Sequence, residues 1–348
     1  MSETDPLSAI DELTRRVAEM SDEAIDEAFD GARQRIHAHR AHLARSFVGR
    51  EEAIEIALLC AVAQEPLLLL GPPGTGKSAL SRRLIESLSI PQSAHFEYTL
   101  TSFSEPSELL GPVDLLALRE GRFRRRVEGM LPTATSAFLD ELFKAGSALL
   151  NTLLTLLNER GFYQQGRLVP ARLLFVFAAS NELPADEGLR ALADRFPLKI
   201  ELQPIKEHRW DELLELGVAG EVARSRRQRP WLNGPASLED LLVVNRALDL
   251  ELQREQGDEG AALRAQRFPP ALQALFKRII FALEREGLCE VSDRALVKLY
   301  RLLRCHALIR HGGAIRVEDL DLLRHISAHE SELRATRERV DALLEELR

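Results

Sequence analysis

Five short apolar runs alternate with longer stretches of helical periodicity in the middle of the chain. The runs cover residues 67–70, 95–100, 137–139, 173–178 and 198–202. Short apolar runs separated by helical stretches are typical of strands that are buried on both faces and joined by crossover helices. The pattern therefore predicts an α/β fold, in which a parallel five-stranded sheet is sandwiched between helices.

Helical periodicity dominates both ends of the chain. Residues 1–46 and 51–64 carry apolar side chains at helical spacing, and only helical stretches follow after residue 207. We therefore expect three parts. They are a helical N-terminal extension (1–46), an α/β domain (47–206) and an all-helical domain that ends in a C-terminal helix (207–348).

The last helical stretch, predicted over residues 317–348, has apolar residues at every seventh position: Ile326, Leu333, Val340 and Leu347. Such a stripe is compatible with a helical seam that docks a partner. Stripes that face the core of the same protein are more common, so packing against the rest of the helical domain is the favoured interpretation.

Two inserted hairpins are predicted within the α/β domain. One covers residues 115–127 with its turn at Glu120–Gly121, and the other covers 161–170 with its turn at Gln165–Gly166. The extension also contains histidines at positions 37, 39 and 42. None of them are four residues apart, so a helical metal pair is not predicted, and we expect these side chains on a solvated face.

Composition and charge narrow the class of protein. A net charge of −8 and a pI near 5.7 argue against general binding to nucleic-acid backbones. The three cysteines show neither paired nor metal-site spacing, which favours free thiols in a reducing compartment. The acidic start lacks a signal-peptide pattern, and no apolar run approaches the ~20 residues that span a bilayer. We expect a cytoplasmic protein without membrane insertion.

The strongest chemical signal lies between the first predicted strand and a helix predicted at 79–88. It is the phosphate-binding P-loop pattern, formed by Gly71, Pro72, Pro73, Gly74, Thr75, Gly76, Lys77 and Ser78, with Ala79 behind it. The glycines allow backbone N–H groups to surround phosphates, and the helix N-terminus adds partial positive charge. Lys77 would lie between the β- and γ-phosphates of ATP, and Ser78 would bind Mg²⁺.

Three polar residues follow later strands. Asp140 and Glu141 come directly after the third run, and Asn181 follows the fourth. The carboxyl ends of parallel strands form the edge at which open α/β sheets bind ligands. Asp140 would complete the Mg²⁺ shell, Glu141 would polarise the attacking water, and Asn181 would hold that water. Each residue alone could equally be a solvated loop residue, and the neighbouring P-loop favours the functional interpretation.

Two arginines and one basic stretch complete the candidates. Arg195 is a candidate arginine finger, which would stabilise charge on the transferred phosphoryl group from a neighbouring subunit. A salt bridge to Asp194 is the alternative. Arg294 begins a helix that Ser292 can cap, and its position alone indicates a solvent-facing side chain. The arginines of residues 119–126 are either solvated or line a pore.

Together these residues resemble the AAA+ superfamily and, within it, the MoxR branch, most closely its RavA-like members. The resemblance covers residues 47–323 and rests on blocks at 96–98, 103–106, 111–112, 138–146, 150–154, 158–160, 179–184 and 291–294. It identifies the fold as a P-loop AAA+ sandwich that binds nucleotide, followed by a helical lid domain.

The resemblance implies a hexameric ring that hydrolyses ATP and remodels a protein client, as a chaperone does, often beside a von Willebrand factor A protein. It makes Asn181 the sensor-1 residue, Arg195 the arginine finger and Arg294 the sensor-2 residue that the lid brings to the γ-phosphate. The two hairpins would line the pore. Two alternatives remain. One is a nucleic-acid motor or loader of the same architecture, and the other is a non-catalytic nucleotide switch, which the complete set of catalytic candidates disfavours.

Overall fold

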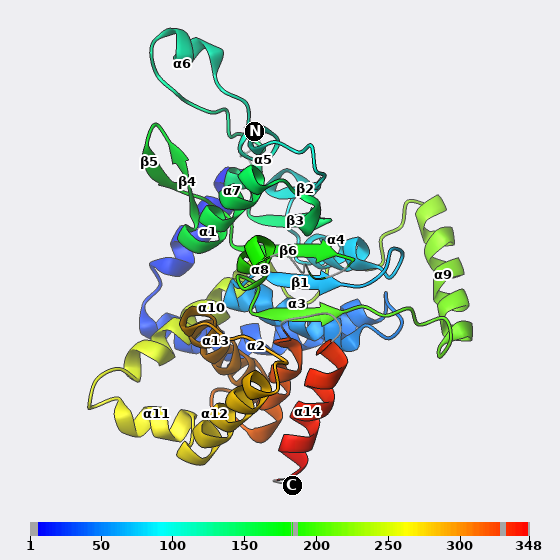
Figure 1. Cartoon of the computed structure of the whole chain (residues 1–348), viewed down its shortest axis with the longest axis vertical. Helices are drawn as coiled ribbons and strands as arrows, with labels where there is room; N and C mark the ends of the chain where they lie inside the picture. Colours follow the sequence, from blue (N-terminus) through cyan, green and yellow to red (C-terminus); the bar gives the residue numbers. More distant parts are fainter. Residues whose placement is uncertain (1–5, 182, 184–186, 328–331, 347–348) are drawn as a thin grey trace.

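The computed structural model describes residues 6–181, 183, 187–327 and 332–346 (Figure 1). Its main sheet has five parallel strands in the order β2–β3–β6–β1–β7. These strands are β1 (Leu67–Leu70), β2 (His95–Thr99), β3 (Ser136–Asp140), β6 (Phe175–Ser180) and β7 (Leu198–Glu201). The predicted α/β fold with a parallel five-stranded sheet is therefore confirmed.

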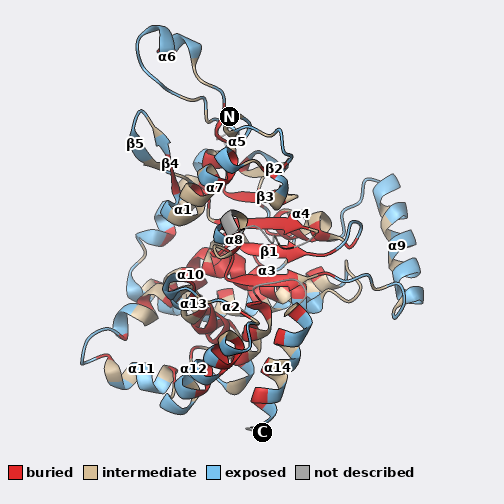
Figure 2. Cartoon of the chain, in the orientation of Figure 1, coloured by how far each residue is buried: buried red, intermediate tan, exposed pale blue. Residues whose placement is uncertain are grey.

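The central strand β1 separates two apolar cores. Leu67 and Leu69 belong to the core that continues into the helical region, whereas Leu68 and Leu70 belong to the core on the other face. Because side chains alternate along a strand, these four consecutive leucines contribute to both cores, and Figure 2 shows the strand β1 coloured as buried. On the first face lie α3 (Glu51–Ala63) and α4 (Lys77–Ser87). The helices of the second face are α5 (Pro106–Leu110), α7 (Ser147–Glu159) and α8 (Glu187–Ala193).

Helices alone follow the sheet in the described part of the chain. They are α9 (Trp210–Ser225), α10 (Leu238–Arg254), α11 (Ala261–Arg267), α12 (Pro270–Arg285), α13 (Asp293–His311), the 3₁₀ segment η4 (Val317–His325) and α14 (Leu333–Glu345). No described helix is long and apolar enough to cross a membrane.

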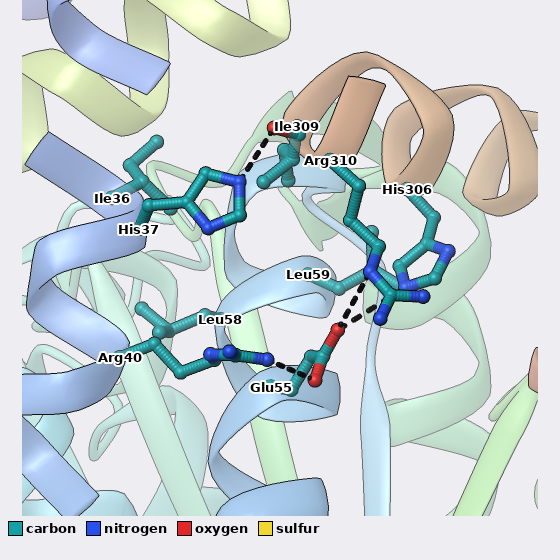
Figure 3. Close-up of a pocket in the computed structure, with 9 residues that line it drawn as sticks. All are labelled: Ile36, His37, Arg40, Glu55, Leu58, Leu59, His306, Ile309 and Arg310. Atoms are coloured by element: carbon teal, nitrogen blue, oxygen red, sulfur yellow. Dashed lines mark hydrogen bonds and ion pairs between the residues drawn. The ribbon is translucent and has the colours of Figure 1, made fainter. Parts of the chain in front are cut away.

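The N-terminal helices α1 (Pro6–Ala18) and α2 (Asp22–Ala44) pack along α10. Helix α2 also contacts α3 and α13, and Figure 3 shows how charges join these three helices. Glu55 of α3 accepts from Arg40 of α2 at 2.6 Å and pairs with Arg310 of α13 at 3.4 Å. Helix α2 therefore connects the helical region to the layer of helices under the sheet.

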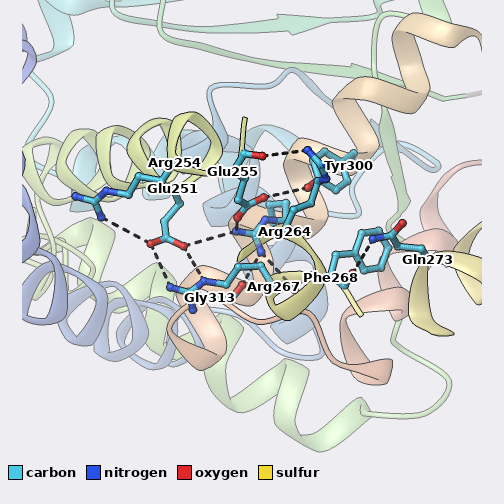
Figure 4. A network of polar contacts seen from close by, with 10 residues as sticks. Glu251, Arg254, Glu255, Arg264, Arg267, Phe268, Gln273, Tyr300 and Gly313 are labelled. Atoms are coloured by element: carbon cyan, nitrogen blue, oxygen red, sulfur yellow. Dashed lines mark hydrogen bonds and ion pairs between the residues drawn. The ribbon is translucent and has the colours of Figure 1, made fainter. Parts of the chain in front are cut away.

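A buried charge network stiffens the helical region (Figure 4). Arg304 of α13 is 1% exposed, pairs with Glu255 and donates to the carbonyl of Gly313 at 2.8 Å. Glu251 pairs with Arg267 at 2.9 Å, which ties α10 to the end of α11. An unpaired arginine at this depth would be strongly destabilising, so these carboxylates and carbonyls hold the helices in one arrangement.

The expected continuous helix over 317–348 is wrong. The 3₁₀ segment η4 ends at His325, and α14 begins as a separate helix at Leu333. Val340, Leu343 and Leu344 of α14 are buried in the core, and Ile326 is buried between the two segments. The apolar stripe therefore packs internally, as the favoured interpretation had it. Leu347 lies outside the described residues.

Of the two predicted hairpins, one is confirmed. Strands β4 (Gly161–Gln164) and β5 (Arg167–Pro170) pair antiparallel around a turn at Gln165–Gly166. Residues 115–127 form no strand pair. They contain the short helix α6 (Leu115–Arg119), and one isolated bridge links Val113 to Arg125. The side chain of Asp114 accepts from the N–H groups of Leu116 and Ala117, and this cap favours a helical turn.

The expectation that the three histidines lie on a solvated face is also wrong. His39 is fully buried, its Nε2 lies 2.8 Å from the Ser87 hydroxyl, and its Nδ1 accepts from the Ala236 N–H at 3.2 Å. The imidazoles of His37 and His42 bond to the carbonyls of Ile309 and Trp231. The face of α2 that carries these histidines is covered by α10, α13 and α4. The periodicity of α2 alone could not reveal that other helices cover this face.

Candidate functional site

The loop between β1 and α4 is built around glycines in conformations that other residues rarely adopt. Gly71, Gly74 and Gly76 have φ values of +133°, +83° and +93°. A Cβ on Gly71 would lie 2.4 Å from the carbonyl oxygen of Leu202, so a side chain cannot be accommodated there without a backbone shift. The loop therefore closes over the end of β1 and leads directly into α4 at Lys77.

Lys77 is directed into this loop. Its ammonium donates to the carbonyls of Gly71 and, at 3.1 Å, Pro72, and to the Oδ1 of Asn181 at 3.1 Å. Burial lowers the pKa of Lys77, while the charges of Asp140 and Glu141 raise it. Carbonyl and amide oxygens, together with the charges of Asp140 and Glu141, therefore hold the ammonium of Lys77 in the loop where the P-loop pattern places the phosphates.

The predicted carboxylates lie on the same edge of the sheet. The Ser78 hydroxyl is 3.5 Å from Asp140 Oδ2, and Asp140 Oδ1 accepts from the N–H of Glu141 at 2.9 Å. Glu141 has φ +54°, a strained conformation for a residue with a side chain. Its carboxylate accepts from the Asn181 amide at 3.1 Å and pairs with Lys144 at 3.2 Å.

The structure thus brings five predicted residues into one connected cluster: Lys77, Ser78, Asp140, Glu141 and Asn181. They meet because β1, β3 and β6 are adjacent and parallel, so their carboxyl ends share one edge.

A pocket of about 820 Å³ opens beside the P-loop. Its walls include residues 72–76 of the P-loop, the segment 45–48, Arg83, Trp231 and one face of α9. The guanidinium of Arg83 lies between the rings of Phe47 and Trp231, 4.8 and 4.5 Å from their centroids. Sequence reasoning missed these three residues, because no local pattern links positions so far apart in the chain.

These residues fit a nucleotide with its magnesium ion. Backbone N–H groups at the start of α4, together with Lys77, suit an anionic phosphate chain. A hydroxyl and a carboxylate, from Ser78 and Asp140, are the hard oxygen ligands that Mg²⁺ prefers. No cluster of three or more His, Cys, Asp or Glu side chains suited to a metal occurs among the described residues.

The structure does not bring Arg195 and Arg294 to this cluster. Arg195 follows α8 and precedes β7, and its guanidinium pairs with Asp194 at 3.0 Å. Arg294 donates to Asn158 at 3.0 Å, near the end of α7. Two residues after Asn158, Arg160 donates to the carbonyl of Leu174, and Leu174 directly precedes the first residue of β6. Both arginines therefore lie at the amino edge of the sheet, opposite the P-loop.

The two inserts lie away from the cluster, and Figure 1 shows α6 and the β4–β5 hairpin projecting from the same end of the molecule. Their tips expose large apolar side chains, including Leu115 (68% exposed), Leu116 (63%) and Tyr163 (61%). Nothing in the described part of the chain covers them.

Comparison with known proteins gives several matches. A family profile for the MoxR domain in the MoxR-vWA-beta-propeller ternary systems matches residues 34–241. Two uncharacterized proteins of Methanocaldococcus jannaschii are 33% and 30% identical over 288 residues, which is 82% of this chain and 69% and 68% of theirs. A structural protein of Acidianus two-tailed virus is 27% identical over 212 residues, 60% of this chain and 34% of its own.

Among solved structures, a candidate ATPase from Cytophaga hutchinsonii superposes with a TM-score of 0.63. It covers 97% of both chains at 18% identity, so it supports the same fold.

Proposed function

The chain belongs to the MoxR family of AAA+ ATPases, and on that basis we propose that it hydrolyses ATP in a hexameric ring and remodels a protein client. The observation that carries this proposal is the cluster of Lys77, Ser78, Asp140, Glu141 and Asn181 beside the P-loop pocket. Closeness to RavA-like members stays a prediction.

In the proposed reaction each residue of the cluster has a distinct task. The P-loop N–H groups and Lys77 bind the phosphate oxygens, and Ser78 and Asp140 would hold Mg²⁺, which supplies positive charge to those oxygens. Glu141 accepts a proton as water attacks the γ-phosphorus and the bond to the bridging β,γ-oxygen breaks. Asn181 holds the Glu141 carboxylate, through the 3.1 Å hydrogen bond, in the orientation needed for this transfer.

We propose that Arg195 and Arg294 act on the nucleotide of a neighbouring subunit. A four-residue strand is about 13 Å long, so neither arginine reaches the P-loop of its own chain across the sheet. A head-to-tail arrangement would place the amino edge of one subunit against the carboxyl edge of the next. The arginines would then complete a site that is incomplete in a single chain, as an arginine finger does.

The exposed tips of the inserts support a protein client. Leu115 and Leu116 are aliphatic, and aliphatic side chains gain little from contact with nucleic-acid bases, which prefer aromatic or guanidinium planes. The arginines of residues 119–126 and the exposed rings of Phe123 (48%) and Tyr163 (61%) favour the alternative, a nucleic-acid motor or loader. Nucleic-acid binding that weakens with salt and disappears when these arginines are replaced would support that alternative.

The family description names von Willebrand factor A and β-propeller proteins as components of the ternary systems. We propose proteins of these kinds as partners. We also propose a cytoplasmic location, because Cys60, Cys289 and Cys305 are free, buried thiols.

Two substitutions test the ATPase proposal. Lys77→Ala should lose ATP binding, because it removes the only ammonium in the described phosphate loop. Glu141→Gln should keep ATP binding and lose turnover by about 10²–10⁴-fold, the usual contribution of a general base. Nucleotide binding and phosphate release should be measured on both variants. Full turnover in Glu141→Gln would remove this residue from its assigned role.

The same Glu141→Gln variant can capture the client. A ring that holds ATP without hydrolysing it should retain the client, whereas Lys77→Ala should not retain it. Proteins recovered equally with both variants would not be clients.

A further inference from the structure

The turn after β3 places a lysine beside the candidate general base. Glu141 precedes the 3₁₀ turn η3 (Leu142–Lys144), and the N–H of Lys144 donates to the carbonyl of Glu141 at 2.9 Å. In a 3₁₀ turn, side chains three residues apart lie one above the other. The ammonium of Lys144 accordingly lies 3.2 Å from Oε1 of the Glu141 carboxylate. The local backbone therefore fixes this pair.

Asn181 donates to the same carboxylate oxygen. Its Nδ2 lies 3.1 Å from Glu141 Oε1, and its Oδ1 accepts from the ammonium of Lys77 at 3.1 Å. Only this orientation of the amide satisfies both neighbours, because a flipped amide would turn N–H groups toward the ammonium and a carbonyl toward the carboxylate. One chain of polar contacts therefore leads outward from the phosphate loop through Lys77, Asn181, Glu141 and Lys144.

The two oxygens of the Glu141 carboxylate differ in their contacts. Oε1 has both Lys144 and Asn181 as partners, whereas no described residue donates to Oε2. The backbone of Glu141 is fixed as well, since its N–H donates to Asp140 Oδ1 at 2.9 Å. A carboxylate that is held through one oxygen keeps the lone pairs of the other oxygen available for a proton.

We propose that Lys144 is a positioning residue for hydrolysis. Together with Asn181 it holds Oε1 of Glu141, so that Oε2 accepts the proton of water as the water oxygen bonds to the γ-phosphorus and the bridging oxygen leaves. The inference rests on the proposed ATPase function, with Glu141 as its general base. Placement of such a group matters, because a misplacement of 1 Å can lower a rate by roughly 10²-fold.

Replacement of Lys144 should affect turnover far more than folding. The side chain of Lys144 is 61% exposed, and an ion pair in contact with water adds little to stability. Lys144→Met keeps an unbranched side chain and removes the charge, so it should melt close to the unmodified chain. Its kcat should fall about tenfold or more, while the KM and the dissociation constant for ATP change by less than about twofold.

Two control variants accompany this measurement. Lys144→Arg keeps the positive charge and the reach of the side chain, so it should restore most of kcat. Lys277→Met removes an exposed lysine of α12 and should leave kcat and KM unchanged. If Lys144→Met keeps the full kcat, or if its kcat and its affinity for ATP fall together, Lys144 does not position Glu141.

A double variant separates action through Glu141 from direct action on the nucleotide. In single-turnover measurements, Lys144→Met should slow the unmodified chain and should have no further effect in Glu141→Gln, because the group that Lys144 positions is then absent. An equal further loss in that background would overturn the proposal. Full turnover in Glu141→Gln would remove the general base itself. If Glu141→Gln is inactive and Lys144→Met is fully active, only the role of Lys144 is wrong.

The contact can also be tested in the chain without nucleotide. A water-soluble carbodiimide activates a carboxylate, and a neighbouring amine then forms an amide with it while one carboxylate oxygen leaves in the urea product. Mass spectrometry should find Lys144 joined to Glu141 by this reaction. A chain in which other exposed carboxylates are modified and these two residues stay unjoined would contradict the contact.

Discussion

At the scale of single residues, the P-loop depends on positions where only glycine fits. Gly71 combines a φ of +133° with a carbonyl oxygen 2.4 Å from where a Cβ would be, whereas Gly74, at φ +83°, has nothing within 4 Å of that point. The two positions share backbone strain and differ in steric contact. They therefore offer a matched pair of substitutions.

We predict that Gly71→Ala destabilises the protein more than Gly74→Ala does. Gly74→Ala should cost about 1–3 kcal/mol from the left-handed backbone alone. Gly71→Ala should cost more and should also weaken ATP binding, because the clash pushes the loop away from Leu202. Thermal unfolding and nucleotide titration of both variants check this. Equal losses of stability in the two variants would mean that the loop relieves the contact with Leu202 without a cost in free energy.

At the scale of elements, α2 is held to its neighbours by polar contacts as well as by its apolar face. His39 joins it to Ser87 at the end of α4 and to the backbone at Ala236, just before α10. Burial, and then the charge of His42, lowers the pKa of His39 to about 4 from 6.5. The folded protein therefore contains the neutral imidazole.

This burial predicts a pH dependence of stability. A histidine whose pKa is lowered by folding contributes stability that is present above pH 6.5 and is lost as the pH falls toward 4, since the unfolded chain then binds the proton first. The full effect is about 3 kcal/mol. His39→Gln should be less stable than the natural chain at pH 7, and the gap should narrow by pH 4.5. Unfolding curves between these values measure it, and a constant gap would contradict the assignment.

Helix α14 provides a test of whether its apolar stripe belongs to the core. Leu344 is 2% exposed, so Leu344→Ala should destabilise by about 2–5 kcal/mol through lost burial and the cavity left behind. The side chain of Arg334 on the same helix is 89% exposed, and Arg334→Ala should change stability by no more than about 0.5 kcal/mol. Denaturant unfolding separates the two. A neutral Leu344→Ala would favour a docking role for the helix.

At the scale of the whole molecule, the candidate site is divided between two edges of one sheet. The phosphate-binding cluster occupies the carboxyl edge, and Arg195 and Arg294 occupy the amino edge, held by Asp194 and Asn158. If this division requires two subunits for one active site, activity should depend on assembly.

We predict that two inactive variants restore each other's activity when mixed. A subunit with Arg195→Ala still has Glu141, and a subunit with Glu141→Gln still has Arg195. An active site is therefore complete where the first kind of subunit supplies the nucleotide site and the second kind supplies the arginine. In an equal random mixture about a quarter of head-to-tail interfaces have this composition, so roughly that share of activity should return. ATP turnover of co-assembled mixtures measures it. Mixed rings without any rescue would remove Arg195 as the finger.

The sequence alone determined the parallel sheet and the phosphate-binding cluster, because both follow from local order. Each strand is a contiguous apolar run. Asp140 and Asn181 follow two of these runs, and the phosphate-binding loop that carries Lys77 follows a third, so parallel strands bring the three residues to one edge. Only the tertiary structure decided the rest. Arg294 meets Asn158 across 136 positions and His39 meets Ala236 across 197, and no periodicity specifies which distant surfaces pack together. The edge occupied by the arginines and the burial of His39 both depend on that packing.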